Sequence, residues 1–121
     1  MTLGSDVSGL STTAASAAAR GLSIVVPLYN EAAGLAMLHE RLIGLARTLK
    51  ARYGLACEVV YVDDGSADNT LAIARSLPAD ALDIQVVSLS RNFGKEAALM
   101  AGLDHARRRR NDSLSRCAFA V

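Results

Sequence analysis

Three clusters of polar residues in this sequence have types and spacings suited to holding a charged small molecule. The first, PLYNE, contains Tyr29, whose flat ring could stack on a base. The second, DDGS, contains Asp63 and Asp64, which could accept hydrogen bonds from a base N–H or a ribose hydroxyl. The third, SRNFGKE, contains Arg91 and Lys95, which could neutralise phosphate groups. A ring, carboxylates and two cations together indicate a nucleoside diphosphate as the ligand.

Each of these residues also has a purely structural interpretation. Pro27 could end a strand, and Tyr29 could pack on the edge of a sheet. One Asp of DDGS could form a turn in which Gly65 takes a positive φ, but that turn does not need the second Asp, and adjacent carboxylates repel each other. Arg91 and Lys95 could be solvated surface charges. The three clusters taken together, rather than any single residue, favour a ligand site.

The clusters follow three segments that are predicted to be strands, and a predicted helix comes after each cluster. The predicted elements are a strand in SIVVPLYN, a helix over 31–52, a strand over 58–62, a helix over 68–76, a strand over 84–89 and a helix over 95–106. The order β-α-β-α-β-α predicts an α/β fold with right-handed crossovers and a parallel sheet. Because the carboxyl ends of parallel strands meet at one edge, the three clusters are expected to form one cleft.

The longest predicted helix is amphipathic, and the second has two candidate caps. Leucines at alternating spacings of three and four form an apolar stripe on the 31–52 helix: Leu35, Leu38, Leu42, Leu45 and Leu49. Ser66 or Asp68 could cap the helix over 68–76, which Pro78 closes. The long helix is therefore expected to turn its apolar stripe to the core.

Composition narrows the class of protein. The chain has 121 residues, of which 51% are hydrophobic, enough for one domain with a core. No apolar run approaches the roughly 18 residues that a membrane span requires. The formal net charge is +1, but residues 107–121 carry five Arg against one Asp, whereas residues 1–106 carry 8 Lys and Arg against 11 Asp and Glu. The basic character lies in the C-terminal segment, and no nucleic-acid partner is expected.

The cysteines, histidines and first residues predict no further site. Cys57 and Cys117 match no metal-binding spacing and suit a reducing compartment, so no disulfide is expected. His39 and His105 have no nearby Cys or second His, so each is predicted to be a solvated or helix-face residue rather than a metal ligand. Residues 1–21 lack the features of a secretory signal and are predicted to be a disordered leader.

Three motifs resemble a known family when they are taken in order and at their separations. They are LSIVVPLYNEAAGL, VVYVDDGSADNT and SLSRNFGKEAALMAGLDHA, and together they cover residues 22–106. They resemble the N-terminal half of family 2 glycosyltransferases of GT-A fold. The third motif is most similar to the branch that transfers a sugar to a polyprenyl phosphate, such as dolichyl-phosphate mannose synthases and bacterial undecaprenyl-phosphate glycosyltransferases. The resemblance implies a partial GT-A, Rossmann-like nucleotide-binding half.

The resemblance also implies a nucleotide-sugar site, a donor and an acceptor. Its residues would be Pro27, Tyr29, Glu31, Asp63, Asp64, Arg91 and Lys95. Pro27, Tyr29 and Glu31 would border the base and ribose. Asp64, together with Asp63, would hold the edge of the base. Arg91 and Lys95 would face the diphosphate. The donor would be UDP- or GDP-linked and the acceptor a lipid phosphate. The expected location is cytoplasmic, with peripheral attachment to the cytoplasmic face of the membrane as an open option.

The resemblance stops at the end of the third predicted helix. In that family a fourth apolar strand and an Asp-x-Asp motif follow, and the motif holds a divalent metal, Mg²⁺ or Mn²⁺, against the diphosphate. Here the sequence is RRRRNDSLSRCAFAV, with no useful apolar strand and no Asp-x-Asp. We therefore expect residues 107–121 to be an Arg-rich segment outside the family pattern, with no metal site and no catalytic residue in this chain.

Two explanations of the Arg-rich segment and two other functions stay open. A frameshift or truncation would explain the abrupt change, whereas a native basic segment could be solvated or could touch anionic lipid or nucleic acid. We expect little or no transferase activity from the chain by itself. A non-catalytic nucleotide-binding module or a receiver-like signalling module is the alternative, although a receiver would carry its acidic pair after the first strand. A half-domain would also leave a sheet edge unpaired after the third strand.

Overall fold

The structure is a computed structural model, and it describes residues 21–110 and 116–118. Its elements are β1 (Gly21–Leu28), α2 (Leu35–Tyr53), β2 (Ala56–Asp63), α3 (Thr70–Ser76), β3 (Leu82–Ser88), α4 (Lys95–Arg110) and β4 (Arg116–Ala118). The predicted α/β class and the order of the first six elements are confirmed. The predicted leader lies outside the described residues except for Gly21, where β1 begins.

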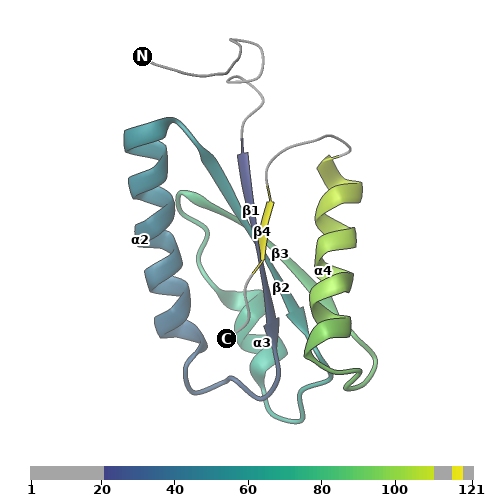
Figure 1. Cartoon of the computed structure of the whole chain (residues 1–121). Coiled ribbons are helices and arrows are strands. Elements are labelled where there is room, and N and C mark those ends of the chain that lie inside the picture. The colour runs from purple at the N-terminus through teal and green to yellow at the C-terminus, as the bar shows by residue number, and fades with distance from the viewer. Residues whose placement is uncertain (1–20, 111–115, 119–121) are drawn as a thin grey trace.

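The strands form one parallel sheet in the order β3-β2-β1-β4 (Figure 1). β1 and β2 pair along their whole lengths, from Gly21 opposite Ala56 to Leu28 opposite Asp63. The sequence predicted no useful apolar strand after the third helix, and the strand that the structure adds there, Arg116–Ala118, has only three residues, which pair with β1. Within the described residues β3 stands at the opposite edge of the sheet and pairs with β2.

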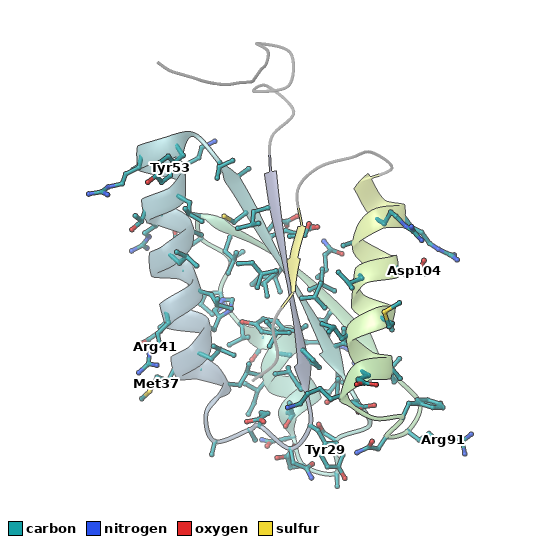
Figure 2. The ribbon with its side chains drawn as sticks, viewed as in Figure 1. Tyr29, Met37, Arg41, Tyr53, Arg91 and Asp104 are labelled. Atoms are coloured by element: carbon teal, nitrogen blue, oxygen red, sulfur yellow. The ribbon has the colours of Figure 1, made fainter. Side chains whose placement is uncertain are left out.

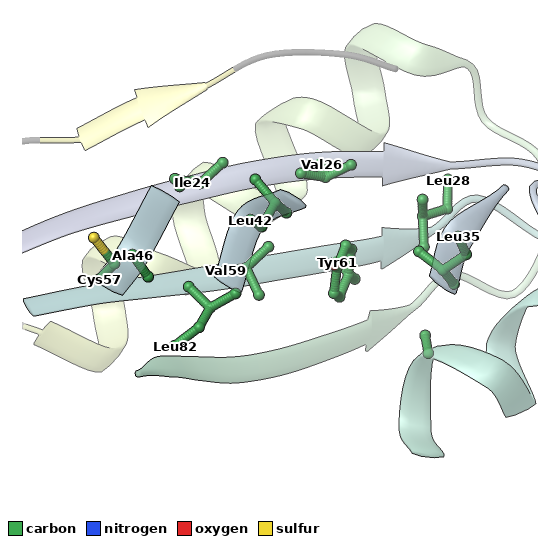
Figure 3. Packing of buried hydrophobic residues seen from close by; sticks show 11 residues of the cluster. Ile24, Val26, Leu28, Leu35, Leu42, Ala46, Cys57, Val59, Tyr61 and Leu82 are labelled. Atoms are coloured by element: carbon green, nitrogen blue, oxygen red, sulfur yellow. The ribbon is translucent and has the colours of Figure 1, made fainter. Parts of the chain in front are cut away.

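Helices cover both faces of the sheet, with α2 and α3 on one face and α4 on the other (Figure 1). Because side chains alternate along a strand, each central strand supplies both cores. Ile24, Val26 and Leu28 face α2, in the cluster drawn in Figure 3, whereas Val25 of the same strand faces α4. The two central strands are buried on both faces, as expected for a parallel sheet.

Helix α4 lies very close to the sheet. A Cβ atom added at Gly102 would come within 2.3 Å of Val25 Cγ1 and 2.8 Å of Val62 Cγ2. A side chain at this position would therefore push the helix away from both central strands. The helix begins at Lys95, as predicted, but continues past Ala106 to Arg110, so the run of arginines is helical rather than a separate tail.

Helix α2 begins later than predicted, and most of its predicted leucine stripe packs against the sheet. It starts at Leu35, after a turn over residues 32–34, and its buried residues are Leu35, His39, Leu42 and Ala46. These residues recur at spacings of four, three and four, which is one face of a helix. Leu45, which was predicted to lie on the apolar stripe, is 43% exposed. Leu38 and Leu49 pack against the same core, so the predicted stripe is confirmed except at Leu45.

His39 is buried, which corrects the prediction that it could be solvated. Its side chain is 1% exposed, and Nε2 lies 2.7 Å from the carbonyl oxygen of Pro78. Because that oxygen can only accept, Nε2–H donates to it, and Nδ1 accepts from the hydroxyl of Tyr61 at 2.7 Å. Burial raises the pKa of the Tyr61 hydroxyl above its ordinary value. His39 thus ties α2 to β2 and to the connection that follows α3.

Helix α3 begins at Thr70 and not at Asp68. Neither predicted cap occupies the N-cap position, which belongs to Asn69. Asp68 still ties the helix start, because its Oδ1 accepts from the backbone N–H of Thr70 at 3.0 Å and from the Thr70 hydroxyl. The bond from that hydroxyl lowers the pKa of the Asp68 carboxyl, and backbone N–H groups lower it further. Ser66 instead takes part in a contact between two loops.

Candidate functional site

The three predicted clusters meet at the carboxyl edge of the sheet. They occupy the loops after β1 (residues 29–34), after β2 (64–69) and after β3 (89–94). In Figure 2 the labelled Tyr29 and Arg91 both lie at this end of the molecule, on the loops that follow β1 and β3. The expectation that the strand ends gather these clusters is therefore confirmed.

Three hydrogen bonds join the loop after β1 to the loop after β2 and to the first residue of α3. The backbone N–H of Asn30 donates to Ser66 Oγ at 2.9 Å, and the N–H of Ala67 donates to Asn30 Oδ1 at 2.8 Å. The N–H of Glu31 donates to Thr70 Oγ1 at 2.9 Å. Asn30 has a φ of 53°, a left-handed conformation that Asn tolerates better than most residues, so the reciprocal pair with the second loop fixes an otherwise unfavourable turn.

The loops after β2 and β3 are joined by Asp64. Its Oδ1 accepts from the backbone N–H of Phe93 at 2.8 Å, and its Oδ2 accepts from the N–H of Gly94 at 3.1 Å. Gly65 allows the close approach, because a Cβ there would come within 2.4 Å of the carbonyl carbon of Arg91. Its φ of 72° also disfavours any other residue. Asp64 and Gly65 thus hold the third loop against the second.

Asp63 is placed differently from its neighbour. It is the last residue of β2 and is 3% exposed. Its Oδ2 accepts from the backbone N–H of Ser66 at 3.3 Å, which closes a turn within its own loop. Its Oδ1 is buried and has no hydrogen-bond partner in the described part of the chain. A buried carboxylate oxygen without a donor is costly, so this atom is a candidate acceptor for a ligand.

A pocket of about 220 Å³ opens beside these loops. It is lined by Pro27, Leu28, Tyr29, Glu31, Asp64 and Lys95. Five of the seven residues predicted for the site therefore line one hollow. Leu28 was not predicted, since an apolar strand residue carries no sign of a site in the sequence. Its carbonyl oxygen accepts from the N–H of Asp64 at 2.8 Å, so its backbone positions the pocket wall.

The remaining two predicted residues lie outside the pocket lining. Asp63 is buried beside it, and Arg91 is exposed, with its guanidinium carbon 5.1 Å from the centre of the Phe93 ring. That distance corresponds to a cation–π contact. Figure 2 shows the Arg91 side chain pointing away from the body of the protein. The structure thus separates Lys95, at the pocket, from Arg91, which packs on its own loop.

The pocket combines an exposed ring, two carboxylates and one cation. Tyr29 is 45% exposed, so its ring is available to a ligand. Lys95 is the first residue of α4, where free backbone N–H groups and the helix dipole add to its positive charge. Among the residues that the structure describes, no group of three or more His, Cys, Asp or Glu side chains could hold a metal ion. The arrangement is suited to binding an anion-bearing aromatic ligand.

Residues 23–109 match the sequence model of glycosyl transferase family 2. The chain belongs to this family. The match covers β1 to α4 and all three loops of the site, so the chain is a glycosyltransferase by family. The matching family is therefore not that of a receiver-like module, which the sequence had left open as an alternative.

Several curated proteins are similar to this chain in sequence. An uncharacterized glycosyltransferase of Synechocystis sp. is 46% identical over 85 residues, which are 70% of this chain and 26% of the relative. A dodecaprenyl-phosphate galacturonate synthase of Rhizobium johnstonii is 42% identical over 89 residues, covering 73% of this chain and 25% of the relative. A bactoprenol glucosyl transferase of Shigella phage SfV is 36% identical over 85 residues, covering 70% and 26%.

The chain therefore spans about a quarter of the length of these curated relatives. The matched quarter contains the three loops and the pocket. In the described ranges, 21–110 and 116–118, none of the helices has the length and apolar character needed to cross a membrane.

Proposed function

We propose that the pocket at the carboxyl edge binds the nucleotide part of a nucleotide-linked sugar. We further propose that this chain corresponds to the donor-binding portion of an enzyme that transfers the sugar to a polyprenyl phosphate. The relatives named for dodecaprenyl phosphate and bactoprenol support that acceptor class. The single observation that carries the proposal is the shared pocket of Tyr29, Asp64 and Lys95, three residues from three different loops or helix starts.

The carboxylates suit the base and ribose. Both oxygens of Asp64 are already fixed by backbone N–H groups, yet a carboxylate has about four acceptor positions, so each oxygen can take another donor. A carboxylate held in this way needs no reorganisation when a ligand arrives. The unpartnered Oδ1 of Asp63 would gain a hydrogen-bond donor if the ligand, or a water molecule bound to the ligand, reached this buried atom. Tyr29 and Glu31 would border the same ligand from the first loop.

Two basic residues suit the diphosphate. Lys95 already lines the pocket, and the N-terminus of α4 adds N–H groups that attract anions. Arg91 would have to rotate from Phe93 toward the phosphate groups, and its exposure leaves room for that movement. We therefore expect Lys95 to contribute more than Arg91 to the first binding step.

Metal assistance is implied by the family resemblance, and the described residues do not fit it. A divalent cation on a diphosphate needs oxygen ligands grouped around one point. The two adjacent Asp residues do not supply this group, because only Asp64 lines the pocket and no cluster of three or more His, Cys, Asp or Glu side chains occurs among the described residues. We therefore propose nucleotide binding as the activity that these residues support, and transfer as one that requires groups outside them.

A lipid-phosphate acceptor would bring the reaction to a membrane surface. The proposed location is the cytoplasmic side, with peripheral contact rather than a span through the described residues. The choice between UDP- and GDP-linked donors stays within the proposal, since the pocket residues offer acceptors that either base could use.

Calorimetric titration of the full chain with UDP, GDP and, as a control, inorganic pyrophosphate tests the proposal. Lys95→Ala should weaken nucleotide binding about tenfold or more through loss of a charge-assisted contact, and Tyr29→Ala should weaken it through loss of stacking. Lys50→Ala is the matched control, because Lys50 is also exposed but lies in the last turn of α2, far from this edge. No detectable binding of either nucleotide, or equal loss in the Lys50 variant, would overturn it.

A further inference from the structure

Asn30 lies between two residues of the pocket wall but does not line the pocket itself. The wall includes Tyr29 and Glu31, which are its neighbours on either side in the chain. Asn30 is exposed, and it was not among the residues that the sequence predicted for the site. Figure 2 shows the labelled Tyr29 at the carboxyl edge of the sheet, on the loop after β1. The conformation of this loop therefore decides whether both neighbours can face one ligand.

The backbone of Asn30 sets the direction of the loop. Its φ of 53° is left-handed, and this conformation is unfavourable for a residue other than glycine unless contacts hold it. A change of Asn30 to an ordinary negative φ would alter the direction of the chain between Tyr29 and Glu31. The pocket wall thus depends on a backbone conformation that needs support from elsewhere in the protein.

Two hydrogen bonds give Asn30 this support, and both reach the loop after β2. Its backbone N–H donates to Ser66 Oγ at 2.9 Å, and its Oδ1 accepts from the N–H of Ala67 at 2.8 Å. Ser66 is itself held, because its own N–H donates to Oδ2 of the buried Asp63 at 3.3 Å. Asn30 is therefore bound to a loop that is anchored at the end of β2.

The backbone on either side of Asn30 is held as well. The N–H of Glu31 donates to Oγ1 of Thr70, a residue that is 0% exposed, at 2.9 Å. The carbonyl oxygen of Leu28 accepts from the N–H of Asp64 at 2.8 Å. Between these two anchor points the first loop is tied to the second through Asn30. All of these contacts are made within the protein, so they need no ligand.

We propose that Asn30 is a positioning residue of the nucleotide site, which holds Tyr29 and Glu31 in the pocket wall through its left-handed backbone and its two hydrogen bonds to the loop after β2. Asn30 acts through these neighbours and does not touch the ligand. The inference rests on the proposed function, because it concerns the binding of the same nucleotide. A ligand that meets an ordered wall does not have to immobilise these side chains, so release of the loop should lower the affinity.

Three substitutions at Asn30 separate its two contributions. Asn30→Ala removes the acceptor and disfavours the left-handed φ, Asn30→Gly removes only the acceptor, and Asn30→Asp retains both. Calorimetric titration of the full chain with UDP and with GDP should show binding about tenfold weaker for Asn30→Ala and about fivefold weaker for Asn30→Gly. Asn30→Asp should bind within about twofold of the unsubstituted chain in about 0.3 M sodium chloride, which screens its added charge.

Urea unfolding of each variant separates positioning from a merely structural role. Loss of stability alone would lower the urea midpoint but leave the dissociation constant in water unchanged, as long as circular dichroism shows the variant to be folded there. Asn69→Ala is the matched control, because Asn69 is also exposed near this edge but has a φ of −90° and makes no capping hydrogen bond with its side chain. It should bind nucleotide within about twofold of the unsubstituted chain.

Ser66→Ala tests the same contact from the second loop. It removes the acceptor of the Asn30 N–H, and Ser66 does not line the pocket. The substitution should weaken nucleotide binding about threefold or more. Combined with Asn30→Ala it should weaken binding by no more than about twofold beyond Asn30→Ala alone, because both substitutions release the same loop. Fully additive losses would contradict a shared contact.

Failure of this inference can be told from failure of the proposed function. Unchanged nucleotide binding in Asn30→Ala, or an equal loss in Asn30→Asp or Asn69→Ala, would overturn the role of Asn30 and leave the proposed function intact. If the unsubstituted chain binds neither UDP nor GDP, the proposed function fails, and the positioning role that rests on it fails too.

Discussion

The backbone N–H of Phe93 donates to Oδ1 of Asp64 across 2.8 Å, which joins the loop after β3 to the end of β2. The second oxygen of the same carboxylate accepts from Gly94 at 3.1 Å. Asp63, one residue earlier, bonds within its own loop through Ser66. The two adjacent carboxylates thus make hydrogen bonds in two different loops, so each has its own structural role. Their remaining acceptor positions are what we assign to the ligand.

Asp64→Ala should destabilise the protein by about 1.5 to 3 kcal/mol, because two backbone N–H donors lose a charged acceptor. Asp64→Asn should cost less, since the amide oxygen can still accept one of the two bonds. Urea unfolding followed by circular dichroism measures both. A variant Asp64→Ala as stable as the original chain would show that the bonds between the loops contribute nothing.

Three glycine substitutions separate backbone strain from steric overlap. Gly65→Ala should be the most destabilising, by at least about 2 kcal/mol, because the residue has a φ of 72° and its Cβ would overlap the backbone of Arg91. Gly54→Ala, with a φ of 67° but open space, should cost about 1 kcal/mol.

Gly34→Ala completes the series, because it has neither a positive φ nor a neighbour within 4 Å. It should change the stability by no more than about 0.5 kcal/mol. The same urea unfolding experiment ranks all three. A Gly65 variant no worse than the Gly54 variant would contradict the close approach of the two loops.

Tyr61→Phe should destabilise the protein by about 1 to 3 kcal/mol, because it leaves Nδ1 of the buried His39 without a donor. The ring itself is retained, so little packing is lost. Tyr53→Phe is the control, since Tyr53 is exposed at the end of α2. Equal stabilities of the two variants, measured by thermal unfolding, would mean that the contact between His39 and Tyr61 does not hold the core.

Asp68 should titrate below its ordinary pKa of about 3.9, chiefly because the Thr70 hydroxyl donates to its carboxylate. A lowered folded pKa adds stability that is present above the unfolded pKa and is lost as the pH falls through the folded value. In Thr70→Val the Asp68 pKa should return upward. Side-chain carbon NMR of Asp68 follows both titrations, and an unchanged pKa in the variant would contradict this cause.

The sequence predicts the first six elements well because each strand is a β-branched run and each polar cluster follows it directly. The leucine pattern also finds most of the buried face of α2, but it includes the exposed Leu45, so a pattern of leucines alone does not locate the centre of that face. His39 could have been found, since it lies four residues after Leu35 and three before Leu42. A residue at this position lies on the same helix face as the two leucines. A polar side chain can be buried there when its polar atoms find hydrogen-bond partners, as those of His39 do.

Other features depend on contacts that no local pattern carries. The strand Arg116–Ala118 has three residues and contains an arginine, so only its pairing with β1 identifies it. The position of Arg91 on Phe93 and the part that Leu28 plays in the pocket wall depend on how the loops pack. Conversely, the five predicted residues that do line the pocket lie on three different segments, and the parallel sheet alone is sufficient to bring them together.

The most direct test of nucleotide binding is an NMR titration of the isotopically labelled chain with UDP and with GDP, following each backbone amide. The account predicts shifts at residues 27–31, at Asp64, and at 93–96, where the pocket and the start of α4 lie. The last turn of α2 should not shift. Saturation with either nucleotide and this pattern would support the proposed site. Shifts confined to the outer face of α4, or none at millimolar nucleotide, would contradict it.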